Sequence, residues 1–381
     1  MLSSAQLEGL VALRRELHRH PEVGFQEHET RERMRAALLR TGLEPEAIKE
    51  CARTGLVVDI LGTGEGEARG VAMVALRTDL DALPMTENNH HLPHRSVNEG
   101  VAHMCGHDGH MACLIGAATL LVQARDKIPK TQTVRLLFQP AEESPGGAPL
   151  MIEEGCLDGV DEVYGMHNWP TVELGTLLTK AGPVMAHTSR FEVVIKGKGG
   201  HGSQPHTVIS RNVSYADPAV LSVCFLHGGE AFNVIPDTCR FGGTIRDLSP
   251  AVFDTIKQRL TTIVEQTCAA YGCECEVDVQ SRYPVLVNSE AENDHVVRLA
   301  KRFFGPDKVG DRLLPMLAAE DFAYYLEKKP GCFFFLGTQE EGRTNALNHS
   351  SDFEFNDSVI PSAVAFWVRL VEDRLNVSLF P

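Results

Sequence analysis

The chain has 381 residues, with 36 Lys and Arg against 51 Asp and Glu, and its formal net charge is −15. So large an excess of negative charge disfavours a protein that binds nucleic-acid phosphates, and we expect no nucleic-acid partner. Hydrophobic residues make up 43% and charged residues 23% of the chain, which is typical of globular proteins and not of disordered or fibrous ones. No apolar stretch approaches the roughly 20 residues that cross a membrane, so we expect no membrane partner.

The N-terminal segment MLSSAQLEGLVALRRELHRH carries charges inside its apolar pattern and lacks the hydrophobic core of a signal peptide, which favours a cytoplasmic protein. Ten cysteines at irregular spacing are then more typical of reduced thiols than of a disulfide framework. Cys268, Cys273 and Cys275 lie near one another in the sequence. The alternating pattern of CECEV is that of a strand, however, and argues against a local metal site there.

The first part of the chain predicts an α/β arrangement. An amphipathic helix is capped near Ser4 and stops before Pro21, and a second helix covers about residues 27 to 41. Four strand-like runs follow, TGLVVDILG, GVAMVALRTD, TVRLLFQP and VDEVYGMHN, with an apolar helix over about residues 110 to 124 between the second and third runs. VAMVAL and RLLF are almost continuously apolar, as strands buried on both faces of a sheet must be.

The pattern changes near residue 186. The runs FEVVIKGK, AVLSVCFLH, CRFGGTIRD and ECEVDVQ read as half-exposed strands, and residues 250 to 271 form an amphipathic helix closed by Gly272. We therefore predict a small α+β domain over residues 186–288.

The α/β pattern returns after this segment. The buried strand CFFFLG is accompanied by three predicted helices, near residues 290 to 304, 319 to 328 and 357 to 374. The small domain is consequently predicted to be an insertion into an α/β domain that is made of residues 1–185 and 289–381.

The densest group of chemically active side chains is HMCGHDGH, residues 103 to 110, next to the apolar helix. Imidazole and thiolate are natural ligands of zinc-like divalent ions, and Cys105 and His107 can face one ion from a turn. The alternative is a histidine-rich loop that only solvates the start of the helix. Three His, one Cys and one Asp within eight residues far exceed ordinary usage. This composition favours a metal site.

Polar side chains also follow three of the predicted strands, where α/β enzymes place their sites. Asp79 and Asp81 follow VAMVAL, Glu142 and Glu143 follow RLLF, and His167 follows the next strand. Each signal is weak alone, because acidic loops are usually solvated and a lone histidine usually satisfies a local hydrogen bond. Their recurrence at equivalent strand ends indicates one site. Two adjacent glutamates allow one to bind a metal ion while the other accepts a proton from water.

Six motifs in order, RTDLDALP, HMCGHDGHMA, FQPAEE, GMHNWP, GKGGHGSQPH and NVIPDTCRFGGTIRDL, resemble the aminoacylase and carboxypeptidase family of two-metal peptidases. The chain is most similar to its hippurate hydrolase and auxin-conjugate amidohydrolase branch. The likeness extends from LRRELHRHPEVGFQE to the C-terminal helix. It implies a mixed-sheet α/β metallopeptidase catalytic domain with an inserted small α+β lid domain. It also implies two divalent metal ions, Zn or Mn, per chain and a homodimer formed through the lid.

The resemblance further implies roles for residues that match the family's motifs. The metal ligands would be Cys105, His107, Glu143, His167 and His349. Glu142 falls on the general base, and Asp79 on the acidic residue that orients a ligand imidazole. In the lid, His201 would polarise the scissile carbonyl, and Asn233 and Arg246 would grip the carboxylate of the substrate. A fork-shaped guanidinium suits that task because it can bind both carboxylate oxygens.

The lid departs from the family in one segment. After His206 the chain runs almost directly into TVISRNVSYADPAVLSV, so that about one helix is missing before NVIPD. A benign loop variation is the alternative, but SRNV resembles the segment that normally follows the helix. The loss predicts a looser lid with uncovered apolar surface and an impaired dimer, and it leaves the metal site unchanged.

The sequence thus predicts a metal-dependent amidohydrolase of the hippurate hydrolase or aminoacylase kind, which cleaves N-acyl amino acids or related amide conjugates. A dipeptidase or deacetylase of the same family is the alternative among enzymes. From another class, the shortened lid permits a metal-loaded protein that binds N-acyl amino acids with little turnover.

Overall fold

The structure, a computed structural model, describes residues 2–196, 213, 218–229, 236–342 and 345–380. His201, Asn233 and the shortened segment after His206 lie outside the described residues. The chain divides into two compact units. Unit 1 consists of Met1–Gly182, Asn288–Leu314 and Tyr324–Pro381, and unit 2 of Pro183–Val287 and Pro315–Ala323.

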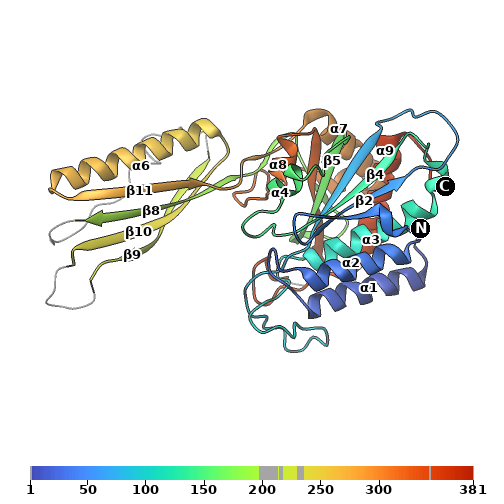
Figure 1. Ribbon diagram of the computed structural model, residues 1–381, viewed down its shortest axis with the longest axis horizontal. Coiled ribbons are helices and arrows are strands. Elements are labelled where there is room, and N and C mark those ends of the chain that lie inside the picture. Colours follow the sequence, from blue (N-terminus) through green and yellow to red (C-terminus); the bar gives the residue numbers. More distant parts are fainter. Residues whose placement is uncertain (1, 197–212, 214–217, 230–235, 343–344, 381) are drawn as a thin grey trace. The chain divides into compact units, whose positions relative to one another are not determined.

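Among the described residues, unit 1 contains an eight-stranded mixed sheet with the order β1-β2-β4-β3-β5-β14-β6-β13. Figure 1 labels β2, β4 and β5 of this sheet. Strand β3 is parallel to β4 and β5, and β5 is parallel to β14, so the centre of the sheet is parallel. The strands are β1 Ile48–Cys51, β2 Gly55–Leu61, β3 Met73–Asp79, β4 Thr133–Gln139, β5 Glu162–Glu173, β6 Leu177–Leu178, β13 Val309–Gly310 and β14 Gly331–Gln339. Every residue of β4 is buried, as its apolar sequence predicts.

The main helices of unit 1 form a layer over this sheet. Helix α3 packs against α1, α2 and α9, and α9 packs against α7, around one hydrophobic core. The helices that contribute residues to unit 1 are α1 Ser4–Arg19, α2 His28–Arg40, α3 His107–Gln123, α4 Ala148–Glu153, α7 Glu290–Phe304, α8 Ala323–Leu326 and α9 Ile360–Leu375. Almost all of α3 is buried because it touches both the sheet and the other helices, which explains its apolar sequence.

The cap of α1 and the length of α8 differ from the sequence predictions. Ser3, not Ser4, caps α1: its hydroxyl accepts the Gln6 N–H at 3.3 Å, and the Gln6 side chain accepts the Ser3 N–H at 2.8 Å. The helix expected near residues 319 to 328 is reduced to α8. There the carboxylate of Glu320 accepts the N–H of Phe322 at 3.0 Å, a local bond that competes with a helical start.

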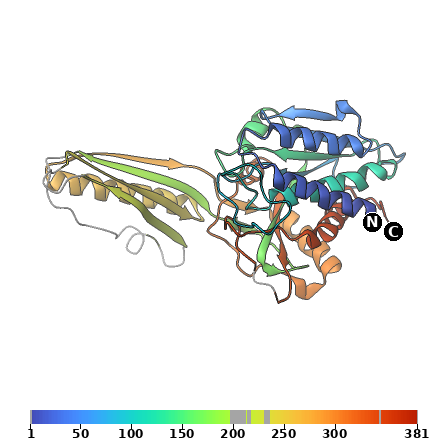
Figure 2. The ribbon, with the colours of Figure 1, turned by 90° about the horizontal axis from the view of Figure 1, so that it is seen from below.

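In its described part, unit 2 is a four-stranded antiparallel sheet with the order β11-β8-β10-β9 and with α6 along one face (Figures 1 and 2). Its core joins Phe191, Val193 and Ile245 of the sheet to the buried face of α6. The elements are β8 His187–Lys196, β9 Ala219–His227, β10 Thr238–Asp247, α6 Pro250–Ala270 and β11 Glu274–Ser281. A two-stranded sheet, β7 Gly182–Met185 with β12 Leu286–Asn288, lies where the chain enters and leaves this unit. The α/β fold with an inserted α+β domain is thus confirmed.

Unit 2 also takes in residues 315–323, which the predicted domain ranges assign to the catalytic domain. The cause is local pairing. Met185 forms a β-bridge with Met316, and the N–H of Ala186 donates to the carbonyl of Ala318 at 2.8 Å.

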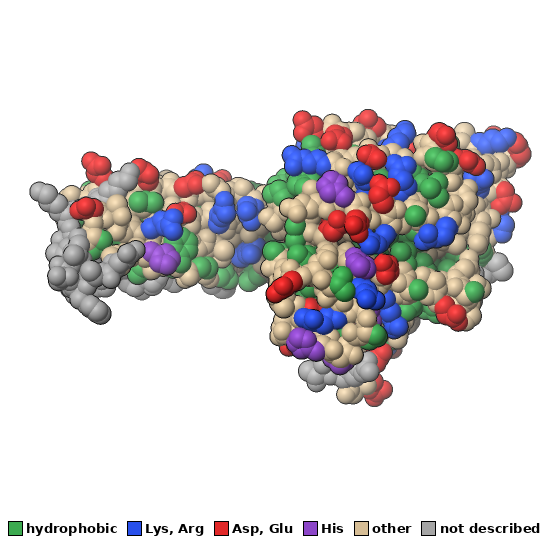
Figure 3. Space-filling model, turned by 60° about the horizontal axis from the view of Figure 1, so that its bottom comes forward, with side chains coloured by type: hydrophobic (Ala, Val, Ile, Leu, Met, Phe, Trp, Pro, Cys, Tyr) green, Lys and Arg blue, Asp and Glu red, His purple; other side chains and the backbone are tan. Residues whose placement is uncertain are grey.

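Surface charge and cysteine chemistry agree with the composition. On the face drawn in Figure 3, Lys and Arg side chains are interspersed with Asp and Glu side chains. The ten cysteines are free thiols. None of the helices in the described part of the chain is both long enough and apolar enough to span a membrane.

Candidate metal centre

The predicted metal ligands meet at one edge of the sheet of unit 1. Asp79 at the end of β3 pairs with Gln139 at the end of β4, and these strands are parallel, so the segments that follow them reach the same edge. Two of the candidate donor groups among the described residues share one thiol: Cys105 with His107 and His167, and Cys105 with Glu143 and His349. Within each group the donor atoms lie within 4.8 Å of one another. The five side chains therefore form a single cluster.

The backbone between the first two ligands makes this cluster possible. Gly106 has a φ of +102°, and a Cβ there would lie 2.3 Å from Oδ1 of Asn168. Glycine, which has no Cβ, permits both the positive φ and the close approach of Asn168. Helix α3 begins directly afterwards at His107, earlier than the expected start near residue 110. The Sγ atom of Cys105 consequently lies 3.3 Å from Nε2 of His167.

Main-chain carbonyls orient two of the imidazoles. Nδ1 of His107 is 2.8 Å from the carbonyl oxygen of Asp81, and Nδ1 of His167 is 2.7 Å from that of Asn168. A carbonyl oxygen only accepts, so Nδ1 donates in both rings and the lone pair of Nε2 is left for a metal ion.

One buried atom of the cluster, Nε2 of His107, has no hydrogen-bond partner among the described residues. Buried polar atoms are nearly always paired, so this atom needs an explanation. A divalent ion would satisfy it, and imidazole, thiolate and carboxylate are the usual ligands of such an ion. The residues present therefore fit a metal site.

His349 closes the cluster from the loop between β14 and α9. Its φ is +66°, an uncommon conformation for a residue with a side chain, and its N–H donates to the carbonyl of Met104 at 2.7 Å. Asn348 donates from Nδ2 to the carbonyl of Cys105 at 2.8 Å. These contacts hold Nε2 of His349 3.1 Å from Oε1 of Glu143.

The charges of the cluster favour a cation. Burial opposes the charged form of His107, but the negative charges of Asp79 and Cys105 outweigh it and raise the pKa of His107 well above its usual range. Contacts with the Cys105 thiol and the Glu143 carboxylate raise the pKa of His349 to about 10. The protons on these two imidazoles compensate the negative charge of the acidic donors. A divalent ion would displace these protons and compensate the same charge.

Asp79 lies near two imidazoles, those of His107 and His110. Its Oδ2 lies 3.9 Å from Nε2 of His107, whereas its Oδ1 is 2.8 Å from Nδ1 of His110 and its Oδ2 accepts from Arg77 at 2.6 Å. His110 also lies 2.7 Å from Oδ1 of Asn168 through Nε2. Asp79 therefore also orients His110, an imidazole to which the sequence motifs gave no role. The available signal was the spacing of three residues between His107 and His110, which puts both on one face of α3.

Asp81 is a second residue whose role the sequence did not reveal. Its buried carboxylate accepts the backbone N–H of Glu142 at 2.9 Å and that of Glu143 at 3.0 Å. Both glutamates, proposed base and proposed ligand, are thus fixed by one side chain, whose backbone carbonyl also orients His107. Glu142 itself is buried.

Arg246 belongs to unit 2, on β10, where it pairs with Thr188 of β8. Burial and the positive charge of Arg282 lower the pKa of Arg246. The N–H of Arg282 donates to the carbonyl of Thr188 at 2.8 Å. Arg246 and Arg282 therefore both neighbour Thr188. The other lid residues, His201 and Asn233, lie outside the described residues.

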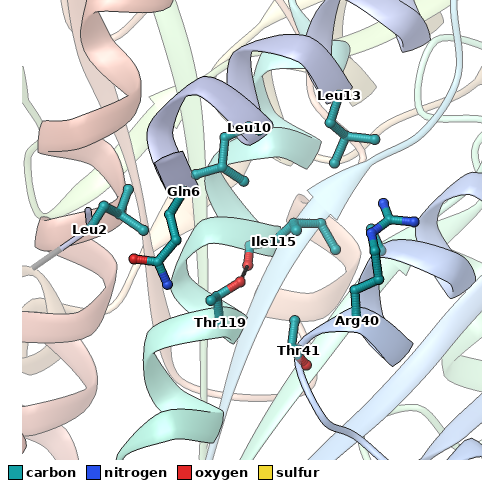
Figure 4. Close-up of a pocket in the computed structure, with 10 residues that line it drawn as sticks. Leu2, Gln6, Leu10, Leu13, Arg40, Thr41, Ile115 and Thr119 are labelled. Carbon is teal, nitrogen blue, oxygen red and sulfur yellow. Dashed lines mark hydrogen bonds between the residues drawn. The ribbon is translucent and has the colours of Figure 1, made fainter. Parts of the chain in front are cut away.

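A pocket of about 150 Å³ lies elsewhere in unit 1, among α1, α2 and α3 (Figure 4). Apolar side chains such as Leu10, Leu13 and Ile115 line it, together with Gln6 and Arg40. It contains none of the metal-ligating residues, so it is separate from the candidate site.

The family described as Peptidase family M20/M25/M40 matches residues 75–373, and the chain belongs to this family. The protein is a metal-dependent enzyme that hydrolyses amide bonds, as the sequence motifs predict.

Individual relatives agree with this assignment. An N-acetyl-L-cysteine deacetylase of Bacillus subtilis is 41% identical over 348 residues, which cover 86% of this chain and 80% of the relative. An IAA-amino acid hydrolase of Arabidopsis thaliana is 35% identical over 390 residues, which cover 96% of this chain and 85% of the relative. The crystal structure of a dinuclear metal binding peptidase of the M20 family from Bacillus subtilis superimposes with a TM-score of 0.83 at 33% identity, over 98% of this chain and 99% of that one.

Protein purified without chelator should contain about two divalent ions per chain by elemental analysis. Cys105→Ala removes the donor that both groups share and should lower the metal content, whereas Cys113→Ala, at a buried thiol of α3 outside the cluster, should not. Acidification should also release metal, because the ligands must be deprotonated. A metal-free wild-type protein would contradict the assignment.

Gly106→Ala should lower metal content and stability together, because a Cβ meets the side chain of Asn168 and the left-handed backbone is strained. Gly175→Ala is the matched control. Gly175 has a φ of +77° but no atom within 4 Å of an added Cβ, so this variant should show strain of about 1 kcal/mol and normal metal content. Equal metal loss in both variants would refute the steric argument.

Proposed function

We propose that this enzyme cleaves the amide bond of N-acyl amino acids or closely related amide conjugates, in the manner of an aminoacylase or hippurate hydrolase. The observation that carries the proposal is the position of Glu142, a buried carboxylate directly before Glu143 of the metal-ligating cluster. The names of two relatives, a deacetylase of N-acetyl-L-cysteine and a hydrolase of IAA-amino acids, support amides of amino acids as substrates.

We further propose two divalent ions, Zn or Mn, held by Cys105, His107, Glu143, His167 and His349. Two donor groups that share one thiol support this number, as does the dinuclear relative. Thiolate and imidazole donors favour zinc, and the carboxylate also suits manganese. Ions bound there supply Lewis-acid polarisation of the scissile carbonyl and lower the pKa of a water molecule.

The chain's own contribution to the reaction is proton transfer. Glu142 accepts a proton from the attacking water and returns it to the leaving amine. Asp81 accepts the backbone N–H of Glu142 and so fixes the position of the backbone that carries the base. Asp79 keeps the ring of His110 in place beside the cluster.

The lid residues bind and polarise the substrate in this proposal. Arg246 grips the substrate's carboxylate together with Asn233, and His201 polarises the scissile carbonyl. The proximity of Arg282 supports the role of Arg246, since two guanidinium groups attract an anion in a chain whose net charge of −15 otherwise repels one.

The homodimer through the lid stays a prediction, and so does a cytoplasmic location. Among the described residues of unit 2, β9 is an edge strand of the sheet, with exposed apolar side chains, Val223 at 41% and Leu226 at 67%. Such an edge can pair with a second copy of the chain. Light scattering decides between the dimer that the resemblance implies and the impaired dimer that the shortened segment predicts.

A panel of N-acetyl and N-benzoyl amino acids, dipeptides and matched carboxamides, assayed after reconstitution with Zn, Mn or Co, tests the substrate class. Faster hydrolysis of N-acyl amino acids than of dipeptides is the expected result. A strong preference for dipeptides would instead assign a dipeptidase.

Glu142→Gln should reduce turnover by about 10² to 10⁴, the usual effect of losing a general base, with nearly normal metal content. Glu143→Gln should lose metal as well as activity, since it removes a ligand. Turnover numbers and elemental analysis of the two variants check this. The opposite pattern would mean that base and ligand are exchanged.

Arg246→Ala should impair hydrolysis of N-acyl amino acids far more than hydrolysis of the corresponding carboxamides, because only the acids offer a carboxylate to the guanidinium. Arg240→Ala is the control, since Arg240 lies on the same strand but pairs with Glu192 at the surface. Ratios of kcat/KM for acid and amide give the readout. Equal loss on both substrates would make Arg246 a structural residue.

A further inference from the structure

The turn after β4 carries both the proposed base and a proposed ligand, and two buried carboxylates hold its backbone. The N–H of Ala141 donates to Oε1 of Glu27 at 2.8 Å. The next two N–H groups, of Glu142 and Glu143, donate to the carboxylate of Asp81. Three successive N–H groups are therefore fixed by side chains from two distant parts of the chain.

Glu27 reaches this turn from the segment between α1 and α2, and it is fully buried. Its Oε2 accepts the hydroxyl of Thr54 at 2.6 Å, so both carboxylate oxygens are held. The segment lies directly against the turn, because a Cβ on Gly24 would come within 2.9 Å of the Cβ of Ala141. Ala141 itself has a φ of +53°, a conformation that a residue with a side chain needs help to keep.

The carboxylate at this position has a cost. Burial, together with the negative charge of Asp81, raises the pKa of Glu27 to about 7. Folding therefore disfavours the ionised form of Glu27. The free energy of unfolding consequently falls as the pH rises from the ordinary pKa of a glutamate towards 7. Buried ionisable groups whose pKa is shifted in this way are candidates for a role at a functional site.

We propose that Glu27 is a positioning residue for the proposed general base: by holding the N–H of Ala141, it fixes the direction in which Glu142 leaves the turn. This inference rests on the proposed function. Displacements of about 1 Å at a catalytic group can lower rates by about 10², so control of the backbone one residue before the base matters for turnover.

Two variants distinguish the effect of the length of the Glu27 side chain from the effect of its charge. Glu27→Asp keeps the charge but is one methylene too short to hold Ala141, and it should lower kcat by about tenfold or more, with KM within about threefold and metal content unchanged. Glu27→Gln keeps the reach and an acceptor oxygen, and its kcat should stay within about threefold of the wild type. Loss in Glu27→Gln with retention in Glu27→Asp would overturn the proposal, because charge and not position would then matter.

Glu22→Asp is the matched control. Glu22 lies in the same segment and accepts the N–H groups of Glu29 and Thr30 at the start of α2, so shortening it should leave kcat unchanged. A fall in kcat equal to that of Glu27→Asp would mean that general loosening of the segment causes the effect. Thr54→Val releases Oε2 of Glu27 and should lower kcat less than Glu27→Asp does. This variant replaces Glu27→Asp in the test if Glu27→Asp does not fold.

Hydrogen exchange of the turn provides a readout that does not depend on activity. Exchange at Ala141 and Glu142 should be faster in Glu27→Asp than in the wild type and unchanged in Glu27→Gln. If the wild type cleaves no N-acyl amino acid, the proposed function fails, but exchange still tests Glu27. Unchanged protection in Glu27→Asp would then overturn the positioning role.

Discussion

The crowding of acidic groups at one edge of a buried sheet is the constraint on which the rest of this structure depends. Glu142, the thiol of Cys105, Asp79 and Asp81 are all buried there. Negative groups cannot share a dry volume unless hydrogen bonds or positive charges compensate them. The parallel strands force this meeting, since β3 and β4 end side by side, and the surrounding side chains supply the compensation.

The compensation follows one rule. Main-chain carbonyls hold the Nδ1–H of His107 and His167, and carboxylates hold main-chain N–H groups, so each metal-ligating or catalytic side chain is fixed through the backbone. The Nδ1 atoms of both imidazoles are thereby occupied, and their Nε2 atoms face the centre. A site prepared in this way needs little rearrangement when an ion or a substrate arrives.

A further buried network supports the start of α3, which carries His107. His18 of α1 lies 2.9 Å from the carboxylate of Asp108 through Nδ1 and 3.3 Å from Glu87 through Nε2. Arg14 of the same helix donates to Asp357 at 2.8 Å. Burial opposes the charge on His18, but these carboxylates outweigh it and raise its pKa to about 9. The first helix thus anchors the metal-binding segment by charge as well as by packing.

The sequence by itself determined the α/β class, the inserted α+β domain and the cluster around Cys105, because apolar periodicity and a contiguous motif are local properties. It placed α7 at Glu290–Phe304, its observed bounds, because the apolar residues there recur at regular helical spacing. Only the tertiary structure decided that Asp79 holds His110, that Asp81 holds both glutamates and that Glu27 holds Ala141. Those partners are separated by 31, 61 and 114 residues, and a hydrogen bond across such a distance leaves no periodic signal in the chain.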